Sequence, residues 1–531
     1  MSVDKPPSVL GAARIISSSI FLSRILGFVR DMLCAGFFGW AWDAFVVAFT
    51  IPNLFRRLFG EGALSSAFIP TFSHYLENQP HSETLKFINT VITILVAFLS
   101  IITLLVILST FAFPILLPLI LPDSYPPEFN SFFAELLRIM IPYLPIICLV
   151  AVLGALLNTL HHFTMPALAS VVLNISWIGG FFAAVWLTND TSQQLTIIAW
   201  FIIIGGLLEI IIQIPPLIKR KIFYSPRWQI NHPGVQEIKR LIIPAIIGLA
   251  PFQINLAVDF LIAGTFVKEP GAISALYFAN RLMQFPLALI GISLATAVFP
   301  LLSRYVARGE INSMKEEVTK VLRFSFFVDM PATIGLIVLA QPIIQLAFQV
   351  LPDSIGINAF STGAVNRCSL VLICYSSALW AYAGSQIITR VFYAFKDMKT
   401  PARLSLYLIF LNLTLNLILV QFIQEAGIAL ATALTGIINF VILLSLLNKK
   451  VKISLTSSSV KSIIASLLMG GLCLWLLSIL PSVNPETTDW SILKPALIRV
   501  FVPALAGLIF YFLISYFLQP DEVRKIIKLK K

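Results

Sequence analysis

The sequence predicts an all-α polytopic membrane protein with about fourteen transmembrane helices. Three observations carry this prediction: the composition, the succession of long apolar runs, and the charge of the loops between them. Hydrophobic residues make up 58% of the 531 residues and charged residues only 12%, whereas soluble domains are about half apolar and a quarter charged. The mean hydropathy is +0.91. These values exclude an ordinary soluble domain.

The apolar runs give the positions of the predicted helices. A membrane-spanning helix needs about 20 predominantly apolar residues, and about fourteen such runs follow one another along the chain. The first run is too polar for a cleavable signal peptide, and no small-x-small cleavage site follows it. We expect spans at residues 9–33, 42–72, 87–120, 131–158, 166–188, 195–218, 237–266, 272–303, 320–350, 367–394, 402–423, 426–448, 458–480 and 493–518.

The loop charges predict the orientation. Loops after even-numbered spans are basic, as in KRKIFYSPRW at 219–228 and the tail RKIIKLKK at 524–531. Loops after odd-numbered spans, such as PDSYPPEFN at 122–130, are acidic or nearly neutral. The positive-inside rule then places both termini in the cytoplasm. These loops also explain the net charge of +12, so the charge does not require a nucleic-acid partner.

A faint internal repeat predicts two lobes. AFIPTFSHY at 67–75 resembles AVFPLLSRY at 297–305, and NTLHHFTMP at 158–166 resembles YAFKDMKTP at 393–401. We expect two six-helix lobes in the same orientation, with a substrate cleft between them as in parallel-repeat transporters. The predicted division is an N-terminal lobe at 1–220 (spans 1–6), a C-terminal lobe at 221–450 (spans 7–12), and spans 13–14 with the basic tail at 451–531.

Charged residues inside the first two predicted spans are the main functional signal. They lie in SRILGFVRD at 23–31 and DAFVVAFTIPNLFRRLFGEGALSSAFIP at 43–70. One arginine near the middle of a bilayer costs about 2.5–3.5 kcal/mol on the insertion scale. An anionic substrate that crosses through a water-filled cavity would explain such a cluster. The residues concerned are Arg24, Arg30, Arg56, Arg57 and Glu61.

The spacing of these residues suggests different roles. Arg24 shares a polar helix face with Ser17 and Gly27. Arg30 lies on a different face of the helix from Arg24 and nearer the outer end of the span. There it either binds substrate or extends to the membrane surface. Arg57 and Glu61 are four residues apart and can pair, whereas Arg56 has no obvious local partner.

Two further residues extend the constellation. Asp43 begins span 2 and can cap the helix or pair with Arg24 or Arg30. Arg281 lies deep in span 8. Guanidinium groups on spans 1, 2 and 8 would line a basic cavity, and each can hold phosphate oxygens with two hydrogen bonds.

A second polar group of residues has the chemistry of a sodium site. Its members provide a carboxylate, two amide oxygens, a backbone carbonyl and a hydroxyl, which are ligands for a hard cation. Ordinary interhelical hydrogen bonding explains the same residues, and the residue pattern alone favours that alternative. The residues are Asp259, Asn412, Asn416, Ile428 through its carbonyl, and Thr432. The five cysteines have no metal-binding spacing, and we expect them to be packing residues.

At these residues the chain resembles the MurJ (MviN) lipid II flippases of the multidrug/oligosaccharidyl-lipid/polysaccharide exporter superfamily. The resemblance runs through the two charged stretches, PALASVVLNIS, ANRLMQFP and FYAFKDMKTP, and covers nearly the whole length. It implies a fourteen-helix, two-lobe exporter of the bacterial inner membrane. The implied substrate is lipid II, an undecaprenyl-diphosphate-linked disaccharide-pentapeptide, which is moved outward for peptidoglycan synthesis. Helices 13 and 14 are implied to form a lipid-facing groove.

The resemblance also implies roles for individual residues. The substrate-binding set carries over to Ser23, Arg24, Arg30, Asp43, Arg56, Glu61 and Arg281, and a sodium site to Asp259, Asn412, Asn416, Ile428 and Thr432. Thr50, Asn280 and Gln284 stand where relatives can carry Lys or acids, which leaves the arginine set intact. We expect a transporter that is not an enzyme, works as a monomer and carries no cofactor except a sodium ion.

Three alternatives are less consistent with the sequence. An exporter of drugs would use more acids and aromatics and fewer arginines in its cavity, and an exporter of another lipid-linked oligosaccharide stays open. A membrane enzyme acting on polyprenyl phosphates would need clustered aspartates, and the chain has no such cluster and no P-loop. A scaffold protein would leave the arginines in the spans unexplained.

Overall fold

The computed structural model describes residues 9–56, 65–119, 125–453, 456–483 and 492–519, and these are helical with no strand among them. The chain forms two compact units, Met1–Phe260 and Leu261–Lys531. The first unit contains the predicted N-terminal lobe and most of the helix that follows it. The division into two repeated lobes stays a prediction.

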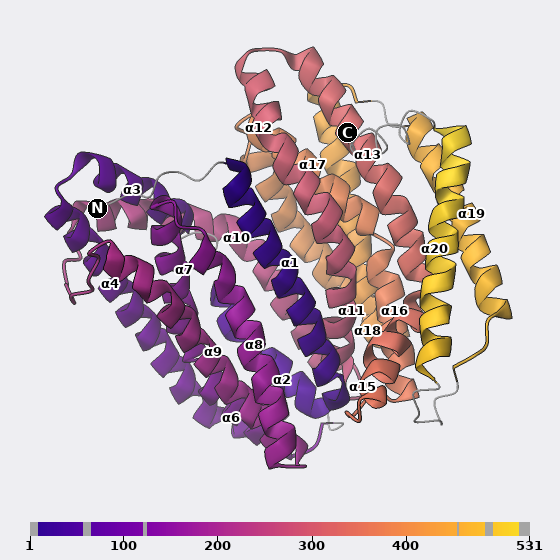
Figure 1. Ribbon diagram of the computed structural model, residues 1–531, viewed down its shortest axis with the longest axis horizontal. Coiled ribbons are helices and arrows are strands. Elements are labelled where there is room, and N and C mark those ends of the chain that lie inside the picture. Colours follow the sequence, from indigo (N-terminus) through magenta and orange to yellow (C-terminus); the bar gives the residue numbers. More distant parts are fainter. Residues whose placement is uncertain (1–8, 57–64, 120–124, 454–455, 484–491, 520–531) are drawn as a thin grey trace. The chain divides into compact units, whose positions relative to one another are not determined.

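Among its described residues the first unit has ten helices, of which the last runs on into the second unit; Figure 1 shows their course. Their bounds are α1 Val9–Leu33, α2 Trp40–Phe55, α3 Ser65–Asn78, α4 His81–Ser109, α5 Phe113–Leu116, α6 Glu128–Met140, α7 Tyr143–Thr159, α8 Thr164–Leu187, α9 Thr191–Lys219 and α10 Pro233–Phe266. Short 3-10 segments connect some of them. Asp190 starts α9 in the way expected of a capping residue, since its carboxylate accepts a hydrogen bond from the Gln193 amide at 2.8 Å.

The described residues of the second unit form ten further helices. Their bounds are α11 Ala272–Leu287, α12 Ser293–Ala307, α13 Ile311–Val338, α14 Ala340–Ile344, α15 Leu351–Ser354, α16 Thr362–Ser376, α17 Leu379–Ala394, α18 Lys399–Lys450, α19 Thr456–Ile479 and α20 Leu493–Leu518. Ala288–Ile292 and Gln345–Val350 form π-helical stretches within this series.

The membrane prediction is confirmed. Ten helical segments among the described residues are long and apolar enough to cross a membrane. Their exposed side chains are apolar, for example Phe98, Ile101 and Leu105 on α4 and Trp186 on α8, which suits contact with lipid. The predicted spans fall on helices, with residues 57–64 of the second span outside the described residues.

Some helices differ in extent from the predicted spans. The helices α4 and α13 begin at His81 and Ile311, before the predicted 87 and 320, because polar residues at a membrane surface continue a hydrogen-bonded helix beyond its apolar part. The predicted span 320–350 is not one helix. Helix α13 ends at Val338, and Pro342 in the short α14 has no backbone N–H to extend it.

A break inside α18 confirms the predicted end of one span and start of the next. Ile423 and Gln424 have non-helical backbone angles, and Gln424 has φ of 51°. Directly after the break, the buried Glu425 accepts a 2.6 Å hydrogen bond from Arg367 of α16, which also donates to the Pro270 carbonyl at 2.8 Å. A Cβ on Gly427 would overlap the carbonyl of Leu419. The turn therefore requires glycine there.

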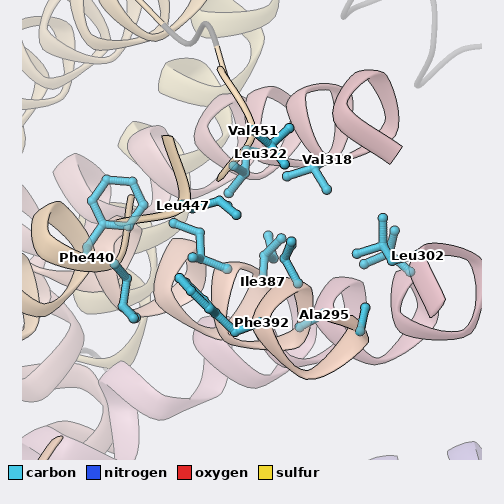
Figure 2. Close-up of a cluster of buried hydrophobic side chains, with 14 of the residues drawn as sticks. Ala295, Leu302, Val318, Leu322, Ile387, Phe392, Phe440, Leu447 and Val451 are labelled. Atoms are coloured by element: carbon cyan, nitrogen blue, oxygen red, sulfur yellow. The ribbon is translucent and has the colours of Figure 1, made fainter. Parts of the chain in front are cut away.

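The largest described core of the second unit is formed by α12, α13, α17 and α18 (Figure 2). Leu302, Leu322, Ile387 and Leu447 have no exposed surface, and the Phe440 ring lies 5.4 Å from the Trp380 ring between centroids. Because lipid tails are as apolar as leucine, helices in a membrane associate through close packing rather than the hydrophobic effect. Interlocked side chains of this kind therefore hold the four helices together.

The C-terminal helices α19 and α20 lie side by side, and α19 packs against α13 (Figure 1). Pro331 in α13 has no N–H, so the carbonyl of Phe327 cannot form its normal bond to the residue four positions later. The hydroxyl of Tyr511 in α20 donates to this carbonyl at 2.6 Å. A side chain from the last helix thus replaces a missing backbone hydrogen bond in α13.

Two turns at equivalent positions of the faint repeat share one conformation. His161 and Lys396 both have φ of 59°. The His161 amide donates to Asn158 and the next amide to Leu157, and the Lys396 and Asp397 amides donate to Tyr393 and Phe392 in the same pattern. The sequence similarity of 158–166 and 393–401 therefore extends to local structure. The turn at Lys221 has this conformation too, so the motif is a general helix end.

The second of these turns should make stability depend on pH. Asp397 accepts hydrogen bonds from Lys450 at 2.7 Å and from the Thr400 amide at 3.1 Å, and the Lys450 bond is the main cause of a pKa for Asp397 below its usual value. A lowered pKa gives stability that is complete above the unfolded value of about 4 and is lost as the pH falls through the folded pKa. We expect less than about 1 kcal/mol, because the pair is partly exposed.

Thermal unfolding in detergent from pH 7 to pH 3 measures this effect. The variant Asp397→Asn should lose part of the acid-dependent destabilisation, and 1 M salt should reduce it in the unmodified protein. Glu310→Gln, at an exposed position, is the control and should leave the profile unchanged. An identical profile for Asp397→Asn would contradict the prediction.

Candidate functional site

Arg30 is buried and paired at the end of α1. Its guanidinium contacts the neighbouring Asp31 at 2.7 Å and donates to the amide oxygen of Asn174 in α8 at 3.0 Å. Only 7% of Arg30 and 4% of Asp31 are exposed. The alternative in which Arg30 extends to the membrane surface was wrong, because an adjacent carboxylate and a neighbouring helix hold the side chain inside the protein.

Aromatic rings from α2 and α8 support this arginine. The Arg30 guanidinium carbon lies 4.4 Å from the centre of the Trp177 ring, a distance at which a cation is attracted to an aromatic face. Phe45 and Phe49 of α2 pack against Trp177 with centroid distances of 5.6 and 5.0 Å. Three helices therefore fix the position of one charge.

The same asparagine also holds Ser23. The Asn174 amide nitrogen donates to the Ser23 hydroxyl at 3.2 Å and to its carbonyl at 3.1 Å. Gly27 faces Asn174 so closely that an added Cβ would lie 3.8 Å from its amide oxygen. Asn174 thus connects two predicted site residues, Ser23 and Arg30, across the contact of α1 and α8.

Arg24 differs from Arg30. It lies next to Ser23 in α1, its side chain is exposed, and no interaction with another described residue involves it. An exposed guanidinium inside a predicted span is available for a ligand. Because Arg30 is paired and Arg24 is exposed on the same helix, the two arginines have different roles.

Arg56 has a local partner, which the sequence analysis did not anticipate. Its Nε donates to the Asn53 side chain at 2.7 Å, one helical turn earlier in α2. The side chain is half-buried. The expected pair of Arg57 and Glu61 lies outside the described residues.

Asp43 is fully buried near the start of α2. Its carboxylate accepts a 2.9 Å hydrogen bond from the hydroxyl of Tyr125, ahead of α6. It lies in the first turn of α2, after the N-cap residue Gly39. The carboxylate therefore connects the start of α2 to a neighbouring segment, and the capping role stays a prediction.

Arg281 belongs to the second unit, in α11. It is half-buried, donates to the Tyr277 hydroxyl at 3.3 Å and lies 5.1 Å from the centre of that ring. On the next turn Gln284 donates to Asn280 at 2.7 Å. These two side chains are therefore hydrogen-bonded to each other.

The expected sodium ligands fall in both units. In α18, the Asn416 amide donates to the Asn412 oxygen at 3.0 Å, and Asn412 donates to the Thr432 hydroxyl at 3.4 Å. Asn412, Asn416 and Ile428 are buried. Asp259 belongs to the first unit, where it is 4% exposed. The two halves of α18 therefore bring the amide and hydroxyl groups together. This is the interhelical hydrogen bonding that the sequence analysis gave as the alternative to a sodium site.

Two members of the arginine cluster were missed. Asp31 directly follows Arg30 in the charged stretch, and Asn174 belongs to the PALASVVLNIS segment. An acid beside an arginine in a predicted span is the signal that could have identified Asp31. No local pattern connects Asn174 to residues about 150 positions earlier, so its role required the structure.

Comparison with known proteins shows the family of this chain. The family model described as "Lipid II flippase MurJ" matches residues 35–488. A "Probable lipid II flippase MurJ" of Vibrio cholerae is 32% identical over 96% of this chain and 95% of its own length. One of Buchnera aphidicola subsp. Acyrthosiphon pisum is 33% identical over 83% of this chain and 84% of its own.

Solved structures show the same relationship. The structure of "Lipid II flippase MurJ, inward closed conformation" has a TM-score of 0.76 and 28% identity, over 95% of this chain and 99% of that chain. An inward-facing multidrug resistance MATE family transporter has a TM-score of 0.63 at 12% identity, over 81% and 94%; this shows a shared fold alone. With a family model and relatives matching most of its length, the chain belongs to the lipid II flippase MurJ family.

Proposed function

We propose that this protein is a lipid II flippase of the bacterial inner membrane, which moves the undecaprenyl-diphosphate-linked precursor of peptidoglycan from the inner to the outer leaflet. The observation that carries the proposal is the exposed guanidinium of Arg24 on α1, inside the first predicted span, where the nearby Arg30 is already neutralised. A cation exposed in that setting suits a diphosphate.

The proposed binding step uses three arginines. Arg24, Arg56 and Arg281 bind the diphosphate, while the sugar and peptide occupy a hydrated cavity. Arg30 does not contact the substrate. It positions Ser23 and Arg24 by fixing α1 to α8 through Asn174. No covalent bond is made or broken, so the protein acts as a transporter and needs no catalytic residue.

Alternating access of the lobes would then carry the headgroup across. The polyprenyl tail stays in lipid along α19 and α20. With both termini in the cytoplasm, a membrane potential that is negative inside favours outward movement of an anion by about 2.3 kcal/mol per charge per 100 mV. The potential can therefore drive export without ATP. This scheme requires one copy of the chain.

Sodium binding is a second part of the proposal. The oxygens of Asn412, Asn416 and Thr432 and the Ile428 carbonyl suit a hard cation. In α18 hydrogen bonds link Asn416 to Asn412 and Asn412 to Thr432, Ile428 is buried, and the carboxylate of Asp259 would complete the set. Bound sodium would neutralise that carboxylate and offset its burial in the membrane.

Replacement of Arg24 or Arg281 by Ala should abolish transport at ordinary expression. Each change removes a charge-assisted contact of about 1.5–3 kcal/mol, equivalent to about tenfold to hundredfold weaker binding. The measurement is whether cells depleted of the native protein and supplied with the variant still expose lipid II to an externally added lipid II-cleaving toxin. Arg308→Ala, at an exposed position after α12, is the control. Full activity of both cavity variants would refute the phosphate-binding role.

Asn174→Ala should reduce transport although Asn174 does not contact the substrate in this scheme. The variant leaves Arg30 and Ser23 without their shared partner in α8, so the end of α1 loses its fixed position. Asn174→Asp keeps an acceptor for Arg30 and should retain more activity. Ile175→Ala, at a 56% exposed position on the same helix, is the control. Normal toxin accessibility with Asn174→Ala would contradict the prediction.

Asn416→Ala should weaken sodium binding by at least about tenfold, because one oxygen ligand is lost. Radioactive sodium binding to the purified protein measures the affinity directly, without a transport assay. Thr414→Ala changes an exposed hydroxyl on the same helix and serves as the control. If the unmodified protein binds no sodium, the residues of α18 only hold its two halves together.

A further inference from the structure

Asp329 is a fully buried carboxyl group that the transport scheme does not use. It lies in α13, within a helix long and apolar enough to span a membrane, and has no exposed surface. A charge at such a position is costly unless a partner neutralises it. The surroundings of Asp329 therefore indicate whether its carboxyl group is ionised or protonated.

Its polar contacts come from its own helix. Ser325, one turn earlier, donates to Oδ2 at 2.5 Å. The other oxygen, Oδ1, is buried without a hydrogen-bond partner among the described residues. Thr333, one turn later, is 3% exposed, and its hydroxyl is likewise without a partner there. Ser325, Asp329 and Thr333 thus place four side-chain oxygens along one face of α13.

No cation neutralises the carboxyl within the described part of the chain. Helix α13 packs against α12, α16, α17 and α19, with smaller contacts to α11, α14 and α20. Arg367 is paired with Glu425, and Arg390 lies over the rings of Phe299 and Tyr393. In the described part of the chain, none of the charged groups on these helices or on α13 itself forms an ion pair with Asp329. These groups are Arg281, Arg304, Lys315, Glu316, Glu317, Lys320, Arg323, Arg367, Arg390, Lys461, Lys494 and Arg499.

Ser325, Asp329 and Thr333 span the turn of α13 in which Pro331 removes a backbone hydrogen bond. Ser325 and Asp329 precede Pro331 and Thr333 follows it, and the carbonyl of Phe327 depends on Tyr511 for its hydrogen bond. A change of charge here would act on the turn of α13 that lacks one of its own backbone bonds. The hydrogen bond from Tyr511 of α20 and the protonation of Asp329 therefore act on the same turn of α13.

We propose that Asp329, with Ser325 and Thr333, forms a proton-binding site in which the buried carboxyl carries a proton. Protonation converts the carboxylate and one proton to a neutral carboxylic acid, with the proton on Oδ1 and the Ser325 hydrogen bond on Oδ2. The Thr333 hydroxyl supplies an acceptor on the same face. A metal cation takes about six oxygen ligands, and the three side chains provide fewer. The proposal does not depend on the identity of the transported lipid.

Infrared spectroscopy of the full-length protein in lipid nanodiscs tests this site. At neutral pH we expect the carbonyl-stretch band of a protonated carboxylic acid, which Asp329→Asn removes. Isotopic labelling of aspartate carboxyl carbons should shift the band in the unmodified protein, so the test does not rely on the variant alone. Ser325→Ala should change the frequency, because it removes the hydrogen bond to Oδ2. Glu316→Gln, exposed on the same helix, should leave the band unchanged.

Two results would overturn the proposal. Absence of an aspartate-derived band at neutral pH would mean that the carboxyl is ionised. Loss of the band when sodium is added at constant pH would mean that a cation, rather than a proton, is the preferred occupant. A band that persists with sodium and disappears in Asp329→Asn supports the proton site.

Discussion

The ion pair of Arg30 and Asp31 is the interaction on which the arrangement of the first unit depends. A charge that remains in the membrane must have a partner, since desolvation is costly. Here the partners come from α1 itself and from α8, and the Trp177 ring covers the guanidinium. The result is a fixed contact between two helices. Arg24, six residues earlier on α1, is held in place by that contact without taking part in it.

Other polar groups in the described spans follow the same principle. Arg367 pairs with Glu425 beside the break in α18, Asp43 accepts from Tyr125, and Glu209 accepts from Tyr143 at 3.4 Å. Each interaction joins segments that are distant in sequence. Polar contacts therefore specify which helices meet, because lipid supplies no hydrophobic force between them. Arg24 is exposed and makes no such contact between helices. Its guanidinium is therefore available to a ligand.

The sequence predicted the membrane class, the helices and the family, because long apolar runs and motif stretches are local signals. It also placed the break after residue 423, since QEAG interrupts an apolar run. It did not predict that Asn174 holds Arg30 or that Asn53 holds Arg56. A side chain's partner depends on helix rotation and packing, and hydropathy contains no information on either. The cation set falls in two units, and its assembly stays a prediction.

The hydrogen bond from Tyr511 to Phe327 has a consequence for biogenesis. The two residues are 184 positions apart, so α13 enters the membrane long before α20 is made. At about 5–20 residues per second of synthesis, the delay is roughly 10–40 s. During this time the Phe327 carbonyl, which Pro331 leaves without its helical hydrogen bond, has no Tyr511 hydroxyl from which to accept one. A ribosome that stops before α20 would release a helix with an unsatisfied backbone group in lipid, which a membrane quality-control protease could recognise as incomplete.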